Sequence, residues 1–324
     1  MTDLLLRAKN VCTYFHIPDG IVKAVDGVDL ELRKQETLGV VGESGSGKSV
    51  TALTAMGLIP NPPGKIISGE IDFLGEDLLK KSKEEMRVIR GSGISMIFQN
   101  PYLALNPLIL IGNQIIEVVR AHKRINRIEA AGMALEMLHW VGIETPKHIM
   151  TSYPFDVSAG NCQRAILAMA LLCRPRLLIA DEPTTLLDAI AQVEVLTLIR
   201  KMKEELKMSI WYISHDFGAI ALMSERIMVM YAGKSVEEAN ANIVLKNARH
   251  PYSVGLINSV PVPGKIVNRL LQIPGEIPDP LRLPEGCSFN PRCEKMMTIC
   301  QREEPPTVQL EEGHSVRCWL YATK

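Results

Sequence analysis

The chain has 324 residues and carries 36 Lys and Arg against 36 Asp and Glu, so its formal net charge is zero. A dedicated nucleic-acid binder usually carries a basic excess, so this balance argues against that class of protein. Apolar residues make up 47% of the chain, which allows one large domain or two smaller ones. The longest apolar run, from Ala165 to Cys173, has nine residues, whereas a membrane-spanning helix needs about 20. Since no targeting segment is visible either, we expect a soluble, cytoplasmic protein.

A strand, a glycine-rich loop and a helix are the first predicted elements that indicate chemistry. The β-forming residues Leu38, Val40 and Val41 predict a buried strand, and the stretch from Val50 to Ile59 predicts a helix. Between them the chain fits the pattern G-x-x-x-x-G-K-[ST]. The matching residues are Gly42, Glu43, Ser44, Gly45, Ser46, Gly47, Lys48 and Ser49.

This order of strand, loop and helix is the context in which the pattern predicts a phosphate-binding loop (Walker A) rather than an ordinary glycine-rich turn. Glycines let successive backbone N–H groups point into one hollow, and the helix N-terminus adds partial positive charge. We expect the loop, together with Val50 at the start of the helix, to bind ATP. Lys48 should reach the β- and γ-phosphates, and the hydroxyl of Ser49 should bind Mg²⁺.

Polar side chains follow three predicted apolar strands. In the stretch RPRLLIADEPTT the apolar run is followed by Asp181 and Glu182. In ISMIFQNP the strand-like run leads to Gln99, and in SIWYISHDFG it leads to His215. Asp181 can hold Mg²⁺, and Glu182 can polarise an attacking water as general base. An Asp-Glu pair is usually solvated and a lone histidine is more often structural, but the carboxyl ends of parallel strands face the ligand crevice. We therefore expect Glu182, Gln99 and His215 near Lys48.

Four cysteines lie in the last forty residues, namely Cys287, Cys293, Cys300 and Cys318, with gaps of five, six and seventeen residues. Structural zinc sites usually begin with a gap of about two to four residues, whereas iron–sulfur clusters tolerate wider gaps. Disulfides are disfavoured in a reducing cytosol. The spacing therefore leaves three alternatives open: an iron–sulfur cluster, a zinc site, or cysteines that bind no metal. The remaining three, Cys12, Cys162 and Cys173, are expected to be ordinary small hydrophobic residues.

The motifs together resemble those of an ABC-type ATPase. They are, in chain order, Gly42–Ser49, Gln99, Ser158–Arg164, Asp181–Glu182, Asp188 and His215. More narrowly, the stretches MIFQNPYLALNP, RHPYSVGLINSVP, LQIPGEIPDP and GCSFNPRC resemble the Q-loop and the C-terminal region of oligopeptide/dipeptide transporter ATPases. The resemblance covers nearly the whole chain.

The resemblance implies an α/β fold with a RecA-like core, an antiparallel β subdomain and a helical subdomain. The ATP-binding domain is expected at residues 1–248, with its helical subdomain at about 101–165. A small C-terminal extension, residues 249–324, is expected to end in a metal-cluster tail. Segment 105–150 has apolar residues three or four apart, which predicts mostly helical structure. The resemblance implies that this subdomain docks the membrane subunits, but packing of the helices into a core explains the spacing of the apolar residues equally well.

The resemblance also implies roles for single residues. Gln99 contacts Mg²⁺ or water, His215 contacts the γ-phosphate, and Phe15 stacks on adenine. Asp188 belongs to a loop that crosses the interface between two ATPase subunits. The signature residues, which act on the ATP of the partner subunit, are Ser158, Ala159, Gly160 and Gln163. All four tail cysteines match a [4Fe–4S] site found in some of these ATPases, with zinc as the alternative.

Partners and location follow from the same resemblance. We expect a second, different ABC ATPase subunit, two transmembrane permease subunits and an extracytoplasmic peptide-binding protein, without nucleic acid. The chain would lie at the cytoplasmic face of the membrane and couple ATP hydrolysis to uptake of di- and oligopeptides. Nickel or sugars are the alternative substrates. Two further functions stay open at this point: a soluble ABC ATPase acting on DNA or ribosomes, and an ATP-binding regulator without turnover.

Two places in the chain depart from the resembled pattern. The signature reads Val157-Ser158-Ala159-Gly160-Asn161 in place of Leu-Ser-Gly-Gly followed by Met or Gln, and Cys162 follows where an arginine is common. After the acidic pair, Leu186 replaces a small alanine. Ala159 adds a β-carbon near phosphate, and if the site needs a positive φ, alanine costs on the order of 1 kcal/mol more than glycine. We therefore expect an asymmetric dimer in which the ATP site completed by this signature turns over slowly.

Overall fold

A computed structural model describes residues 3–100, 104–259 and 272–322 of the chain. The chain forms two compact units: unit 1 comprises Met1–Lys80 and Tyr212–Lys324, and unit 2 comprises Lys81–Trp211. The expected C-terminal extension therefore shares a unit with the phosphate loop, and its boundary at residue 249 stays a prediction. Parts of the expected Q-loop (101–103) and of the extension (260–271) lie outside the described residues.

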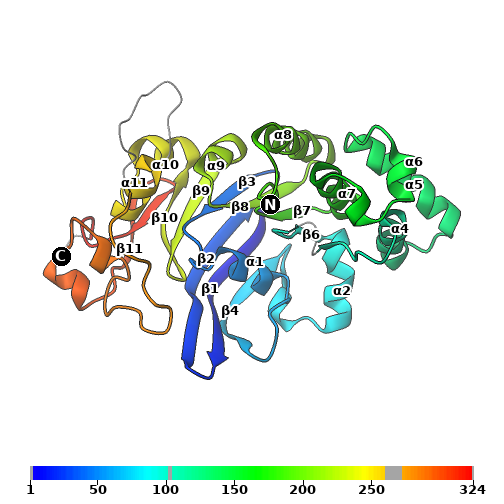
Figure 1. Cartoon of the computed structure of the whole chain (residues 1–324). Helices are drawn as coiled ribbons and strands as arrows, with labels where there is room; N and C mark the ends of the chain where they lie inside the picture. The colour runs from blue at the N-terminus through cyan, green and yellow to red at the C-terminus, as the bar shows by residue number, and fades with distance from the viewer. Residues whose placement is uncertain (1–2, 101–103, 260–271, 323–324) are drawn as a thin grey trace. The chain divides into compact units, whose positions relative to one another are not determined.

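Unit 1 contains a four-stranded antiparallel sheet in the order β2-β1-β4-β5. Its strands are β1 (Leu4–Ile17), β2 (Gly20–Arg33), β4 (Gly64–Phe73) and β5 (Glu76–Asp77). β1 and β2 form the long blue hairpin of Figure 1. The side chains of Leu6, Leu30 and Leu32 are buried. Along the end of β2, buried and exposed residues alternate, as expected for a sheet with one covered face. The predicted antiparallel β subdomain is confirmed.

The second sheet of unit 1 joins the phosphate-loop strand to the C-terminal residues. The first five strands in the order of this sheet are β11-β12-β10-β9-β3. β3 (Thr37–Val41) runs parallel to β9 (Arg226–Tyr231), and β9 is antiparallel to β10 (Lys234–Asn240). β12 (His314–Arg317) and β11 (Thr307–Glu311) add antiparallel strands at the edge. The tail thus extends the sheet that carries the phosphate loop (Figure 1).

Short helices and turns complete unit 1. They are α1 (Lys48–Ala55), η1 (Leu78–Lys80), α9 (Phe217–Met223), α10 (Ala241–Asn247), α11 (Pro251–Asn258), η3 (Asn290–Arg292) and η4 (Thr298–Gln301). The division between the units falls within β8 (Ser209–Ser214), whose residues are all buried.

Unit 2 is mostly helical around two short parallel strands. β6 (Ile94–Ile97) pairs with β7 (Leu177–Asp181), and every residue of β7 is buried. The helices are α2 (Lys83–Ser92), α4 (Ile111–His122), α5 (Arg127–Trp140), α6 (Pro146–Met150), η2 (Pro154–Asp156), α7 (Ala159–Leu171) and α8 (Ala189–Leu206). The predicted helical character of segment 105–150 is confirmed. Across the residues that the structure describes, none of the helices combines the length and apolarity needed to cross a bilayer.

Side-chain caps fix where two of these helices begin. Ser82 accepts the N–H of Glu85 at 3.2 Å, and the Glu85 carboxylate accepts the N–H of Ser82 at 2.8 Å. Asn126 and Glu129 repeat the arrangement at α5. Such reciprocal caps satisfy backbone donors that the first helical turn leaves without an intrahelical partner.

Candidate functional site

The glycine-rich loop between β3 and α1 has a backbone that only glycine tolerates at key points. Gly45 and Gly47 have positive φ angles of 78° and 101°. A β-carbon on Gly47 would collide with the carbonyl oxygen of Ala24, and one on Gly42 with that of Met230. The helix starts at Lys48, two residues earlier than expected, and ends at Ala55. The predicted strand, loop and helix are therefore present in that order.

The Lys48 ammonium lies within the loop. Its Nζ donates to the carbonyl oxygens of Gly42 (2.7 Å) and Glu43 (2.9 Å) and to Ser46 Oγ (3.3 Å). Lys48 is only 5% exposed. A cation enclosed by a loop whose N–H groups precede a helix is suited to hold an anion such as a polyphosphate.

Unit 2 holds the acidic pair at the carboxyl end of β7. Asp181 is the last residue of the strand and is 5% exposed. Glu182 has a φ of 47°, a left-handed conformation that costs a non-glycine residue on the order of 1–3 kcal/mol and often marks a functional position. Gln99 Nε2 donates to Glu182 Oε2 at 2.8 Å, although β6 ends two residues before Gln99. The expected approach of Gln99 to Glu182 is therefore observed.

Sequence reasoning missed one partner of Glu182. The hydroxyl of Thr185 donates to Glu182 Oε2 at 3.0 Å and to the Glu182 carbonyl at 3.2 Å. The carboxylate is thus held by an amide and a hydroxyl donor within unit 2. The repeated threonine in EPTT was the available signal, because a turn after Pro183 brings residue 185 back towards residue 182.

His215 and Phe15 lie in unit 1 with the phosphate loop. His215 directly follows β8 and is exposed. Phe15 is half-buried on β1 and lies opposite Gly64 of β4. Thr13, two residues before it, shares a 2.8 Å hydrogen bond with Thr54 of α1, so the strand of Phe15 is fastened to the helix that follows the loop. Contacts of these two side chains with nucleotide stay predictions.

The signature residues form the start of α7. Ser158 is the N-cap and accepts the N–H of Asn161 at 3.3 Å. Ala159 is the first helical residue and does not have a positive φ. The backbone strain that a positive φ would have caused at this alanine is therefore absent. A β-carbon on Gly160 would meet no atom within 4 Å. Gln163 is only 2% exposed, and its action on the ATP of a partner subunit stays a prediction.

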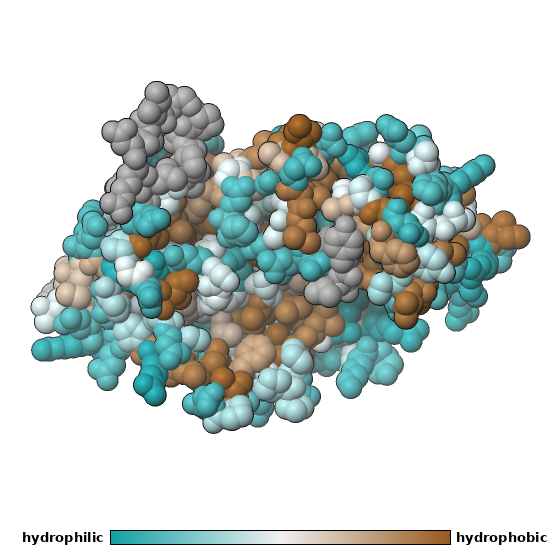
Figure 2. All heavy atoms as spheres, in the orientation of Figure 1, coloured by the Kyte–Doolittle hydropathy of each residue, from teal (hydrophilic) through white to brown (hydrophobic). Residues whose placement is uncertain are grey.

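Asp188 caps α8, and an apolar surface stands beside it. The Asp188 carboxylate accepts the N–H groups of Ile190 and Ala191 at 3.0 Å each. Leu186, Ile190 and Val193 are 50%, 75% and 56% exposed. Figure 2 shows hydrophobic surface over the region of α8. The crossing of a subunit interface by Asp188 stays a prediction, and these exposed side chains are compatible with it.

The four tail cysteines surround one small cavity. Cys287, Cys293, Cys300 and Cys318 all line it, beside His250. Burial raises the pKa values of the Cys287 and Cys318 thiols to about 11, and it also raises the pKa of Cys293. Within residues 3–100, 104–259 and 272–322, no group of three or more His, Cys, Asp or Glu residues is arranged to hold a metal ion. Whether the thiols bind a metal therefore stays a prediction.

The phosphate loop on β3–α1 and the Asp-Glu pair that ends β7 define a class: a P-loop protein that binds and hydrolyses a nucleoside triphosphate. Comparisons with known proteins make the class narrower. A family model described as "ABC transporter" matches residues 25–185. A second, described as "Oligopeptide/dipeptide transporter, C-terminal region", matches residues 236–300.

Similar proteins extend over the whole chain. The oligopeptide transport ATP-binding protein AppD of Bacillus subtilis (strain 168) is 43% identical over 317 residues, which are 98% of this chain and 97% of AppD. The oligopeptide transport ATP-binding protein OppD of Escherichia coli (strain K12) is 43% identical, with coverage of 98% and 93%. The dipeptide transport ATP-binding protein DppD of Bacillus subtilis (strain 168) is 42% identical, with coverage of 98% and 95%.

Solved structures similar to this chain include an ATP-binding cassette and a part of an ABC transporter complex. The dimeric ATP-binding cassette MJ0796, in a post-hydrolysis state with ADP and Pi, has a TM-score of 0.65 and 25% identity, and the match covers 73% of this chain and 99% of that one. The cbiO1 protein of Clostridium perfringens, part of the ABC transporter complex cbiONQ, has a TM-score of 0.64 and 25% identity, with coverage of 76% and 92%. The chain belongs to the ABC transporter family and is one of its ATP-binding, ATP-hydrolysing proteins.

Proposed function

We propose that this chain is the ATP-hydrolysing motor subunit of an ABC importer for di- and oligopeptides. The observation that carries the proposal is the match of residues 236–300 to the C-terminal region of oligopeptide/dipeptide transporters, behind an ABC cassette in the same chain. Relatives similar over nearly their full length are named as oligopeptide or dipeptide transport proteins. The peptide substrate is inferred from the names of those relatives.

Each candidate residue has its own proposed task in the nucleotide chemistry. The loop N–H groups and Lys48 bind the phosphates, and Phe15 stacks on adenine. The side chains of Ser49, Asp181 and Gln99 supply oxygen donors, the type that Mg²⁺ prefers. Mg²⁺ when bound would neutralise charge on the phosphate oxygens.

Glu182 orients and deprotonates the attacking water. Its Oε2 accepts from Gln99 at 2.8 Å and from Thr185 at 3.0 Å, so the carboxylate has a fixed orientation. A general base needs its carboxylate within reach of the attacking water, and a fixed orientation serves that need. His215 would contact the γ-phosphate from the end of β8. The left-handed backbone of Glu182 supports a functional rather than a structural constraint at this position.

The four tail cysteines are proposed to hold a [4Fe–4S] cluster, with zinc as the alternative. In favour of a metal, they line one cavity and all offer thiols, the ligand set of such clusters. A cluster keeps its thiolates further apart than a single zinc ion does, because iron and sulfide atoms lie between them. A bound metal would displace protons from thiols whose pKa values burial has raised. The group would supply a cross-link for a segment with little core of its own.

The partners are proposed from the family and from the surface of unit 2. The exposed side chains of Leu186, Ile190 and Val193 recur three or four residues apart and support a contact with a second ATPase subunit. A heterodimer is proposed, together with two permease subunits, a peptide-binding protein and a peripheral location at the cytoplasmic face of the membrane. Nickel or sugars remain the alternative cargo.

Uptake measured in cells of the organism that encodes this chain tests the proposal. The chromosomal gene would be replaced by a Glu182→Gln copy, and entry of a radiolabelled tripeptide, of nickel and of a labelled disaccharide would be followed. We expect loss of tripeptide uptake alone, with recovery when wild-type protein is supplied. Loss of nickel or sugar uptake instead would assign that cargo, and no loss at all would contradict an importer role.

A further inference from the structure

Glu43, the second residue of the phosphate loop, is held by two side chains from the C-terminal extension. Its backbone N–H donates to the hydroxyl of Tyr252 at 2.8 Å. Its carboxylate accepts two hydrogen bonds from Arg292, Nη1 to Oε2 at 2.7 Å and Nη2 to Oε1 at 3.0 Å. Both contacts lie within unit 1. More than two hundred residues separate Glu43 from either partner, so the extension reaches back to the loop.

The two partners are anchored from several sides. Tyr252 is fully buried, and the Arg292 side chain is 4% exposed. Arg292 Nε donates to the carbonyl of Pro274 at 3.0 Å, and its guanidinium lies 5.8 Å and 6.0 Å from the ring centroids of Tyr231 and Phe289. A bidentate pair whose arginine is buried and packed on aromatic rings is a fixed contact, unlike most exposed ion pairs.

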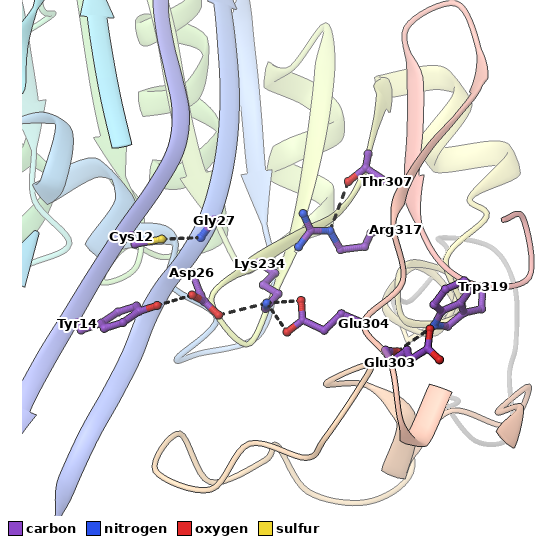
Figure 3. A network of polar contacts seen from close by, with 10 residues as sticks. All are labelled: Cys12, Tyr14, Asp26, Gly27, Lys234, Glu303, Glu304, Thr307, Arg317 and Trp319. Atoms are coloured by element: carbon purple, nitrogen blue, oxygen red, sulfur yellow. Dashed lines mark hydrogen bonds and ion pairs between the residues drawn. The ribbon is translucent and has the colours of Figure 1, made fainter. Parts of the chain in front are cut away.

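The extension is also tied to the rest of unit 1 at a separate place. Figure 3 shows Lys234 between Asp26 of β2 and Glu304 of the tail, with N–O distances of 3.1 Å and 2.6 Å. Tyr14 of β1 donates to the same Asp26 at 2.6 Å. Loss of the Arg292 contact would therefore leave the tail attached, and its consequence would appear at the loop.

The charge of Glu43 gives this contact a consequence for ATP. A carboxylate in a loop that must bind phosphates repels them, and because the Glu43 side chain is 25% exposed, water screens this repulsion only in part. Arg292 neutralises that charge and fixes the carboxylate in one orientation. Tyr252 meanwhile fixes the backbone N–H of the same residue. The two contacts therefore keep the charge and the backbone conformation of the loop suited to binding the phosphates of ATP.

We propose that Arg292 is a positioning residue of the nucleotide site, acting through Glu43, and that the C-terminal extension thereby sets the affinity of the phosphate loop for ATP. The proposal rests on the proposed nucleotide-binding function of the loop. It assigns the extension a second task besides any metal: it completes the charge balance of the site.

Binding of a fluorescent ATP analogue to the purified full-length chain, with Mg²⁺, tests the proposal. Arg292→Gln should weaken binding about tenfold, since the charge of Glu43 in the loop would then repel the phosphates without compensation. Arg302→Gln, which removes an equal charge from an exposed tail position, is the matched control and should bind as the wild type does. Arg292→Lys keeps the charge but loses the bidentate geometry, and we expect an intermediate affinity.

A second substitution separates charge balance from mere support of the tail. Glu43→Gln added to Arg292→Gln should restore affinity to near the wild-type value, whereas a collapsed tail would not be repaired by it. Glu43→Gln alone, which keeps the backbone N–H of the loop but leaves the charge of Arg292 without a counter-charge, should bind the analogue more tightly than the wild type, and this arm does not depend on folding of an Arg292 variant. Unchanged binding by Arg292→Gln, or weak binding that Glu43→Gln fails to restore, would overturn the proposal.

The reference variant is Lys48→Ala. If wild-type protein fails to bind the analogue, or Lys48→Ala binds it equally well, the phosphate loop itself has been misassigned and the nucleotide function fails. If Lys48→Ala loses binding and Arg292→Gln does not, only the role of Arg292 fails.

Discussion

At the scale of single residues, Glu182 has the most direct chemical task. Glu182→Gln should bind ATP but hydrolyse it at least about a hundredfold more slowly, because the water loses its base while Lys48 and the loop are unchanged. The measurement is phosphate release by the assembled ATPase pair, with ATP retention followed by filter binding. Thr185→Ser, which keeps the hydroxyl that donates to Glu182, serves as control. Normal hydrolysis by Glu182→Gln would mean that the base lies elsewhere.

Ala159 tests whether the departures in the signature matter. The structure removes backbone strain as a reason, since Ala159 begins α7 without a positive φ. The remaining reason for slow turnover is steric: the β-carbon of Ala159 and the half-exposed side chain of Leu186 add bulk on the side that we propose to face a partner subunit. We expect Ala159→Gly with Leu186→Ala to raise the turnover of the ATP site completed by this signature several-fold. Turnover of each site would be measured with the opposite site blocked by a P-loop lysine substitution, and equal rates with no change would contradict the asymmetry.

Glu238 predicts a dependence of stability on pH. Burial raises the pKa of its carboxyl to about 7, with Glu36 and Glu31 adding to the effect, although Arg226 lies 3.3 Å away. A raised folded-state pKa gives stability that is complete below the unfolded value of 4.5 and is lost as pH rises through 7. Glu238→Gln should therefore gain up to about 3 kcal/mol relative to wild type between pH 4.5 and pH 8.

Urea denaturation at a series of pH values measures this gain. Glu311→Gln, at an exposed position of β11, is the control and should show a constant difference from wild type. A constant difference for Glu238→Gln as well would show that its carboxyl titrates normally.

At the scale of elements, the cysteine tail should respond to loss of one thiol. Cys293→Ser should lose the metal, and hydrogen exchange should become faster in residues 280–322. Because Cys293 directly follows Arg292, we also expect weaker nucleotide binding, although the phosphate loop itself is intact. Protein prepared without oxygen should contain about four irons per chain in the wild type. One zinc and no iron would favour the alternative metal, and neither metal would exclude both.

The sequence predicted elements whose signals are local. The run before Gly42 specified β3, and the glycines at positive φ specified the loop, because few other residues adopt that backbone. The end of α1 was placed too late, since propensity alone does not set helix boundaries. The approach of Gln99 to Glu182 was foreseeable, because the carboxyl ends of parallel strands meet at one edge of a sheet.

Features that depend on tertiary contacts could not be predicted in this way. Nothing in the stretch NPRC indicates that Arg292 pairs with Glu43, since the two residues are 249 positions apart. Likewise, β12 joins β10 only once the tail has folded back. The burial of Gln163 also depends on packing around α7.

At the scale of the whole molecule, the protein is a motor whose nucleotide site we propose to be completed by its own C-terminal extension. Unit 1 carries the loop and the extension, and unit 2 carries the acidic pair and the signature. Each of these parts is proposed to serve one process, in which ATP hydrolysis by this chain drives peptide across a membrane. ATP hydrolysis and peptide transport are coupled in this process, so the two should be measured together.

ATP-driven uptake of a labelled peptide by the purified transporter in proteoliposomes, with the binding protein added on the opposite side from ATP, measures this coupling. We predict uptake that requires ATP at the face where this chain lies, and its loss in a transporter whose only change is Lys48→Ala. Peptide uptake at the wild-type rate by the Lys48→Ala transporter, or ATP hydrolysis that moves no peptide, would contradict the proposed coupling.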